Sequence, residues 1–153
     1  MGATGALAFS QVASGYSQAS AQRAEGDYQK SIFDINARFA EAQAKDAIKR
    51  GDKEAIELKK RAKRLIGSQR VSLAAQGIDI ESGTALQIQE DTAELSEADA
   101  MTIRNNAWKE AWGYRVQAFD FRNRGEFAKM SSRNRARNTL LTSGIQAAGT
   151  YQQ

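Results

Sequence analysis

The chain has 153 residues, a length typical of one domain, and 22 basic against 18 acidic residues give it a formal net charge of +4. It contains no Pro that would interrupt a long helix, and no Cys or His, so it has no disulfide, no thiolate zinc site and no histidine general base. A phosphate-binding glycine loop and metal-ligand spacings are also missing, so the sequence predicts no enzyme, no cofactor and no metal site.

Residues 1–22 form a first segment that is small and uncharged, and the first charged residue is Arg23. Phe9, Val12 and Tyr16 follow helical spacing, although several glycines weaken an isolated helix here. The segment shows neither a secretory signal nor a conventional membrane span.

Residues 23–76 predict one long helix with two apolar series that are out of phase by two residues. Such a phase slip makes a coiled-coil seam drift around the helix. The first series is Tyr28, Ile32, Ile35, Phe39 and Ala42, and the second is Ala44, Ile48, Gly51, Ala55, Leu58, Ala62 and Leu65.

Residues 77–83 predict the turn between two long helices. Gly77 is suited to end the first helix, Ser82 or Thr84 to cap the second, and Gly77 or Gly83 to adopt a positive φ. A turn near position 81 makes an antiparallel hairpin in which facing residue numbers sum to roughly 162.

Residues 84–138 predict the second long helix. A seven-residue repeat, typical of coiled-coil packing, runs through Leu86, Ala93, Ala100, Ala107, Tyr114, Phe121 and Ala128. Trp108, Trp112 and Phe119 widen the apolar stripe toward a second face. Two helices cannot cover both Trp side chains, so we expect one in the core and one at a contact with another chain.

The charges are segregated along the chain. Seven acids and no base lie between Asp79 and Asp99, and a basic run at 59–64 faces them in the hairpin, so the two runs are expected to neutralise each other. A second basic run is less well matched by acids and is a candidate contact for DNA backbone or an acidic partner. It comprises Arg122, Arg124, Lys129, Arg133, Arg135 and Arg137.

Residues 139–153 form a second uncharged segment, which the hairpin places beside residues 1–22. We expect this end to contact a membrane or neighbouring copies, because its small residues permit close helix contacts. The residues assigned to that contact are Leu7, Phe9, Val12, Tyr16, Leu140, Leu141 and Ile145.

The predicted fold is therefore a single all-α domain: a long, elongated antiparallel helical hairpin with coiled-coil-like packing. Apolar residues make up 41% of the chain, and much of this share is Ala, so the core per residue is thin. We expect the chain to gain stability by assembling into a homo-oligomer.

Four segments of the chain resemble internal virion proteins, also called core or DNA-ejection proteins, of short-tailed bacteriophages. They are GSQR (67–70), AAQGIDIESGT (74–84), IRNNAW (103–108) and AWGYRVQA (111–118). The likeness extends to the small-residue N-terminus, the region of Asp27 and the Thr139–Thr142 tail.

The resemblance implies a protein packed inside the capsid near the portal that leaves the particle before the DNA. Such proteins help to build a conduit across the host envelope, and the smallest member is associated with the outer membrane. Portal and other core proteins are the implied partners. Two alternatives stay open: a structural coiled-coil adaptor of the portal or tail without a membrane role, and a DNA-binding coiled coil.

Overall fold

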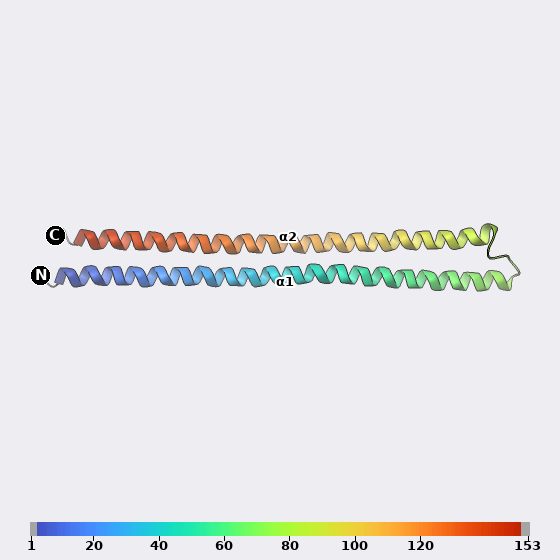
Figure 1. Ribbon diagram of the computed structural model, residues 1–153, viewed down its shortest axis with the longest axis horizontal. Coiled ribbons are helices and arrows are strands. Elements are labelled where there is room, and N and C mark those ends of the chain that lie inside the picture. Colours follow the sequence, from blue (N-terminus) through green and yellow to red (C-terminus); the bar gives the residue numbers. More distant parts are fainter. Residues whose placement is uncertain (1–2, 151–153) are drawn as a thin grey trace. The chain divides into compact units, whose positions relative to one another are not determined.

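The computed structural model describes residues 3–150, and the side chains of residue 10 and residues 12–149. Within these residues there are two α-helices and no strand. Helices α1 (Ala3–Ala75) and α2 (Gly83–Thr150) run antiparallel and pack against each other (Figure 1). The all-α helical hairpin expected from the sequence is confirmed.

Both helices are longer than the sequence predicted. Helix α1 begins at Ala3 instead of residue 23, and α2 continues to Thr150 instead of ending near residue 138. The described residues of the uncharged segments are helical because the two segments lie against each other, and Gly15 directly contacts the side chain of Ser143. Tertiary packing thus offsets the weak helix propensity of the glycines.

The turn is formed by two glycines with positive φ, as expected: 73° at Gly77 and 60° at Gly83. The amide of Ile78 donates to the carbonyl of Leu73 and that of Gly77 to Ala74, which is the Schellman arrangement that ends a helix at a left-handed glycine.

Hydrogen bonds from side chains stabilise the second half of the turn. The Asp79 carboxylate accepts bonds from the Glu81 amide (3.0 Å) and the Ser82 hydroxyl (2.7 Å), and these bonds lower its pKa. The buried Gln89 side chain donates to the Ile80 carbonyl. The expected Ser82 cap is therefore replaced by a hydrogen bond to Asp79.

The pairing register differs slightly from the expected one. Gly26 faces Ser132 and Gly51 faces Ala107, so facing residue numbers sum to 158 instead of 162. The reason is that α1 ends at Ala75 and α2 begins at Gly83, which centres the turn on position 79.

The contacts divide the hairpin into two units, each containing part of both helices. The terminal unit pairs the described residues of Met1–Ala40 with those of Gln117–Gln153, and the turn unit is Glu41–Val116. Each unit has its own small core.

In the terminal unit the core consists of Ala37, Ala40 and Ala118, with Phe121 packed against them. The rings of Phe33 and Phe121 lie 6.5 Å apart at an angle of 31°. Gly26 faces Ser132, which is fully buried, so small residues bring the two helices close together.

In the turn unit the core consists of Ala44, Ala47 and Ala111, with Ile48 and Tyr114 beside them. Gly51 faces Ala107 so closely that a methyl group on Gly51 would overlap the Ala107 methyl. The second predicted series of α1 is thus mainly right, although Leu65 is exposed.

The first predicted series of α1 does not face α2. Tyr28, Ile32, Ile35 and Phe39 are exposed, and Ala42 is exposed as well. On α2 the seven-residue repeat is buried or half-buried from Ala100 to Ala128, whereas Leu86 and Ala93 are exposed. The face of α1 that carries Ala37 and Ala40 admits the closer approach, and the first series is left outside.

Candidate interaction surface

The described residues place their small apolar side chains inside and their large ones outside. Every fully buried hydrophobic residue among them is an alanine, while 22 large hydrophobic residues are exposed. Ordinary helical pairs bury their Leu, Ile and aromatic side chains, and contiguous exposed apolar patches mark interaction sites. The outer faces are therefore the candidate functional surface.

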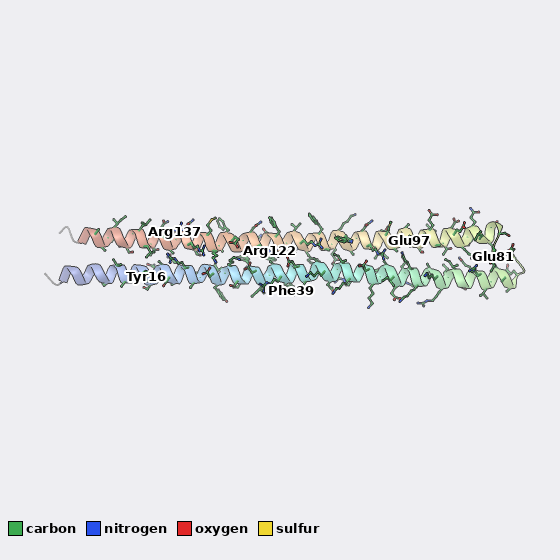
Figure 2. The ribbon with its side chains drawn as sticks, viewed as in Figure 1. Tyr16, Phe39, Glu81, Glu97, Arg122 and Arg137 are labelled. Carbon is green, nitrogen blue, oxygen red and sulfur yellow. The ribbon has the colours of Figure 1, made fainter. Side chains whose placement is uncertain are left out.

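Helix α1 carries one such surface in the terminal unit, here called the outer patch. It consists of Tyr28, Ile32, Ile35 and Phe39, spaced four, three and four residues apart, so that they share one side of the helix. Phe39 is 65% exposed and lies on the side of α1 turned away from α2 (Figure 2).

Helix α2 carries further exposed apolar residues in each of the two units, here together called the outer stripe. Its exposed members recur at intervals of eleven residues, which is three turns of a helix with 3.67 residues per turn. One series is Trp108, Phe119, Met130 and Leu141, and the stripe is completed by Met101, Trp112, Val116, Phe127 and Ile145.

Neither Trp side chain belongs to the core. Trp108 is 54% exposed and Trp112 is 66% exposed, so the expectation that one of them is buried was wrong. The intervening position on the inner face is Ala111, which is fully buried against Ala44 and Ala47 of α1. The Arg115 guanidinium lies 5.4 Å from the centre of the Trp108 ring in a cation–π contact.

The net charge is concentrated in the terminal unit. Residues 1–40 and 117–153 hold nine basic and five acidic residues, whereas residues 41–116 hold thirteen of each. The surplus of four positive charges comes from the basic segment, defined as residues 122–137.

Several charges in this region are neutralised within the hairpin. Lys129 pairs with Asp27 at 2.9 Å, and the hydrogen bond from Lys129 lowers the Asp27 pKa. Lys30 bonds Asp34 and Glu126, and both bonds raise the Lys30 pKa.

The arginines of the predicted basic run differ in the contacts that they make. Arg124 pairs with Asp120 on its own helix at 2.8 Å, and Arg122 is exposed. Among the described residues no ion pair is formed by Arg133, Arg135 or Arg137, although Arg135 donates to the Ser132 hydroxyl. Two shallow grooves flank this segment, one lined by Lys30, Lys129, Arg133 and Arg137, the other by Arg124 and Arg135.

The acidic run of α2 is matched only in part by the basic run at 59–64. Lys59 bonds Glu97 at 2.6 Å and lowers its pKa. Lys60 instead bonds Glu57 on its own helix. Of the expected neutralisation between the two runs, the structure shows one ion pair that joins the helices. Such an exposed pair sets the register of the helices more than it adds to stability.

The uncharged ends lie side by side as expected. A shallow groove between them is lined by Ser14, Gln18, Asn138 and Thr142, among others. Val12, Tyr16, Leu141 and Ile145 are exposed and Leu140 is half-buried, whereas the side chains of Leu7 and Phe9 lie outside the described residues. A helix long and apolar enough to cross a membrane is not found in the described part of the chain.

No group of acidic side chains in the described range is arranged to hold a metal ion. No family model matches the chain, and neither the curated proteins nor the solved structures include a similar one. The functional argument therefore depends on the surface itself.

Sequence reasoning singled out five members of the outer stripe, Trp108, Trp112, Phe119, Leu141 and Ile145, but missed Met101, Val116, Phe127 and Met130. The structure shows Val116, Phe127 and Met130 as exposed apolar residues. The recurrence of apolar residues every eleven positions is the sequence signal that would have predicted them. A search limited to seven-residue repeats follows the alanine face and passes over this one.

Proposed function

We propose that this chain is a structural subunit of a multi-chain helical assembly, and that the assembly belongs to the interior of a short-tailed phage particle. In that setting it acts during genome delivery as an internal virion protein, packed near the portal and released to help form a conduit through the host envelope. The virion setting comes from the resemblance of its turn and tryptophan segments to that family.

One observation supports the assembly: the large apolar side chains lie outside the hairpin, while the interior is filled by alanine and glycine. Removing an exposed Trp, Phe, Ile or Met side chain from water is worth about 1.5–3 kcal/mol each. The alanine interior offers much less apolar area per residue. Association with other chains is therefore where most of the available hydrophobic stabilisation lies.

Sedimentation of the purified chain over a wide concentration range tests the assembly. We expect a concentration-dependent oligomer whose helical content and thermal stability rise together with association. A monomer with high thermal stability at micromolar concentration would refute this part of the proposal.

The particle itself tests the virion role. We expect the chain in intact particles and its loss from particles that have released their genome. If it stays bound to the emptied shell, the structural adaptor of the portal or tail is the correct function.

Two variants separate assembly from delivery at the uncharged end. Val12→Asp and Ile145→Asp each place a charge on an exposed apolar position. Thr142→Asp, at an exposed polar position, is the matched control. Normal particle assembly with impaired delivery by the first two variants is the expected outcome, and normal delivery by both would exclude a conduit role for this end.

The basic segment supports a second candidate function, contact with DNA backbone. Arginine binds phosphate well, and Arg133, Arg135 and Arg137 form no ion pair among the described residues. Replacing Arg133 and Arg137 by Gln is expected to weaken duplex binding and to reduce the salt slope by about 2. Arg61→Gln together with Arg64→Gln in the turn unit is the control, and an equal loss in both pairs would show that the segment has no special role.

A further inference from the structure

The terminal unit has two unpartnered apolar surfaces, not one. The outer patch of α1 holds Tyr28, Ile32, Ile35 and Phe39, and the part of the outer stripe in this unit includes Phe119, Phe127 and Met130. Each lies away from the face that its helix buries in the hairpin, where Ala37 and Ala118 meet. A twofold dimer through either surface would leave the other uncovered, whereas a head-to-tail contact covers both.

The two surfaces lie at the same position along the helix axes of the unit, and residues at the same position along these axes are called level with each other. Asp27 pairs with Lys129, Lys30 with Glu126, and the Phe33 ring packs on Phe121. In the register of the hairpin, residues 27–39 of α1 are therefore level with residues 119–131 of α2.

When a neighbouring copy is placed by rotation about an axis parallel to the helices, its residues stay at the same positions along that axis as those of the first copy. The outer patch of one copy then meets the outer stripe of the next in the antiparallel sense. In the register of the hairpin, Phe39 of one copy is level with Phe119 of its neighbour, and Tyr28 with Met130.

The apolar residues of the two surfaces also recur at the same interval along their helices. Tyr28 and Phe39 are eleven residues apart, as are Phe119 and Met130. Two helices whose contacting residues recur at the same interval stay in register along the contact, because their seams drift around the helix axes at the same rate.

Charge decides which surface of a second copy fits. Residues 117–137 of α2 hold six basic and two acidic residues, so pairing α2 with α2 of another copy sets two strongly positive segments together. Residues 25–40 of α1 hold three acids and two bases. Like-charge contact disfavours the first arrangement, and the second avoids it because the α1 segment carries no excess of positive charge.

From these observations we propose that the outer patch of α1 docks on the outer stripe of α2 in a second copy of this chain, head to tail and antiparallel. This inference rests on the proposed assembly and adds to it the two faces that meet, their direction and their register. Repetition of the same contact forms a closed ring when its rotation divides a full turn, and a filament otherwise.

Cysteine cross-linking tests the contact, since the chain has no Cys of its own. Ile35 and Asn123 are exposed and level with each other, so Ile35→Cys protein is mixed with Asn123→Cys protein and treated with a short bismaleimide. We expect a heterodimeric product in excess of either homodimer. Ser17→Cys, exposed and predicted to lie on the same side of α1 as Phe39 but about 27 Å from residue 35 along the helix, is the control and should not link to Asn123→Cys.

Each result has a defined meaning. A dominant Asn123→Cys homodimer would show a twofold α2 contact, and a product from the Ser17→Cys control would show a different register; either overturns the inference. If the unsubstituted chain sediments as an oligomer but no link forms, this interface is wrong and the proposed assembly stands. If the chain is monomeric at every concentration, both fail.

A second pair of variants tests the head-to-tail geometry. Tyr28→Glu with Phe39→Glu removes the outer patch, and Phe119→Glu with Met130→Glu removes the facing part of the stripe. All four side chains are exposed, so circular dichroism at a dilution where the parent is also monomeric should show both variants as helical as the parent. We expect each alone to be monomeric and an equimolar mixture to stop at a dimer, because only one intact contact remains. Continued oligomerisation of either variant alone would overturn the inference.

Discussion

The closest approach of the two helices can be tested with one methyl group. Gly51 is buried against Ala107, and a Cβ at this position would overlap the Ala107 Cβ and lie 3.6 Å from the Ile103 carbonyl oxygen. Gly67, on the same helix and in the same unit, has no neighbouring atom within 4 Å of such a carbon. Gly51→Ala and Gly67→Ala are therefore the same chemical change with and without a steric conflict.

The expected magnitudes have opposite signs. Replacing Gly by Ala inside a helix favours folding by about 1 kcal/mol in both variants. Overpacking a close contact costs about 1–3 kcal/mol, and this cost applies only to Gly51→Ala. Gly67→Ala should thus raise the free energy of unfolding by about 1 kcal/mol, and Gly51→Ala should lower it by about 0–2 kcal/mol. For a chain of this size a difference of about 1–3 kcal/mol amounts to several degrees in Tm.

The measurement is urea and thermal unfolding followed by circular dichroism at one fixed protein concentration. Adding Ala107→Gly to Gly51→Ala removes the overlapping methyl, so the two substitutions should show a favourable coupling of about 1–3 kcal/mol in a double-mutant cycle. Equal stabilisation by Gly51→Ala and Gly67→Ala would refute the claim that the helices nearly touch at Gly51.

Three further outcomes follow from the turn and the charges. Gly77→Ala should cost about 1 kcal/mol of stability, since the φ of 73° is unfavourable for a side chain, and unfolding in urea will measure it. Gln89→Met removes the bond to the Ile80 carbonyl and should lower stability by about 0.5–1.5 kcal/mol, with faster amide exchange confined to the turn. The bond from Lys129 lowers the Asp27 pKa in the folded chain, so this contribution is present at neutral pH and is lost as the pH falls below about 4; Asp27→Asn should flatten the acid side of the stability profile.

The sequence alone was sufficient to predict the helices and the turn. A chain without Pro can sustain very long helices, and only residues 77–83 combine a helix-ending glycine with residues that begin a new helix. The positive φ at Gly77 and Gly83 was predictable for the same local reason: without a Cβ, glycine adopts this conformation at little cost. The buried series through Ala100, Ala107 and Tyr114 followed from its seven-residue spacing.

The extent of the helices needed tertiary information. Residues 1–22 and 139–153 are rich in Gly, Ser and Thr, so their local propensity predicts frayed ends. In the folded chain Gly15, which has no side chain, lies directly against the Ser143 side chain across the hairpin, and such contacts support the described residues of both segments as helix. Propensity describes each helix by itself and carries no information about the opposite one.

Which face of each helix points inward was also decided only by the tertiary structure. Helix α1 has an aromatic face at Tyr28 and Phe39 and an alanine face at Ala37 and Ala40, and periodicity assigns both to a helix equally well. Gly26, Gly51, Ser132 and Ala107 all lie on the faces that meet, and two backbones can approach this closely only where no large side chain separates them. The Trp108 and Trp112 indoles are too large for that space, so the large apolar side chains remain on the outside of the hairpin.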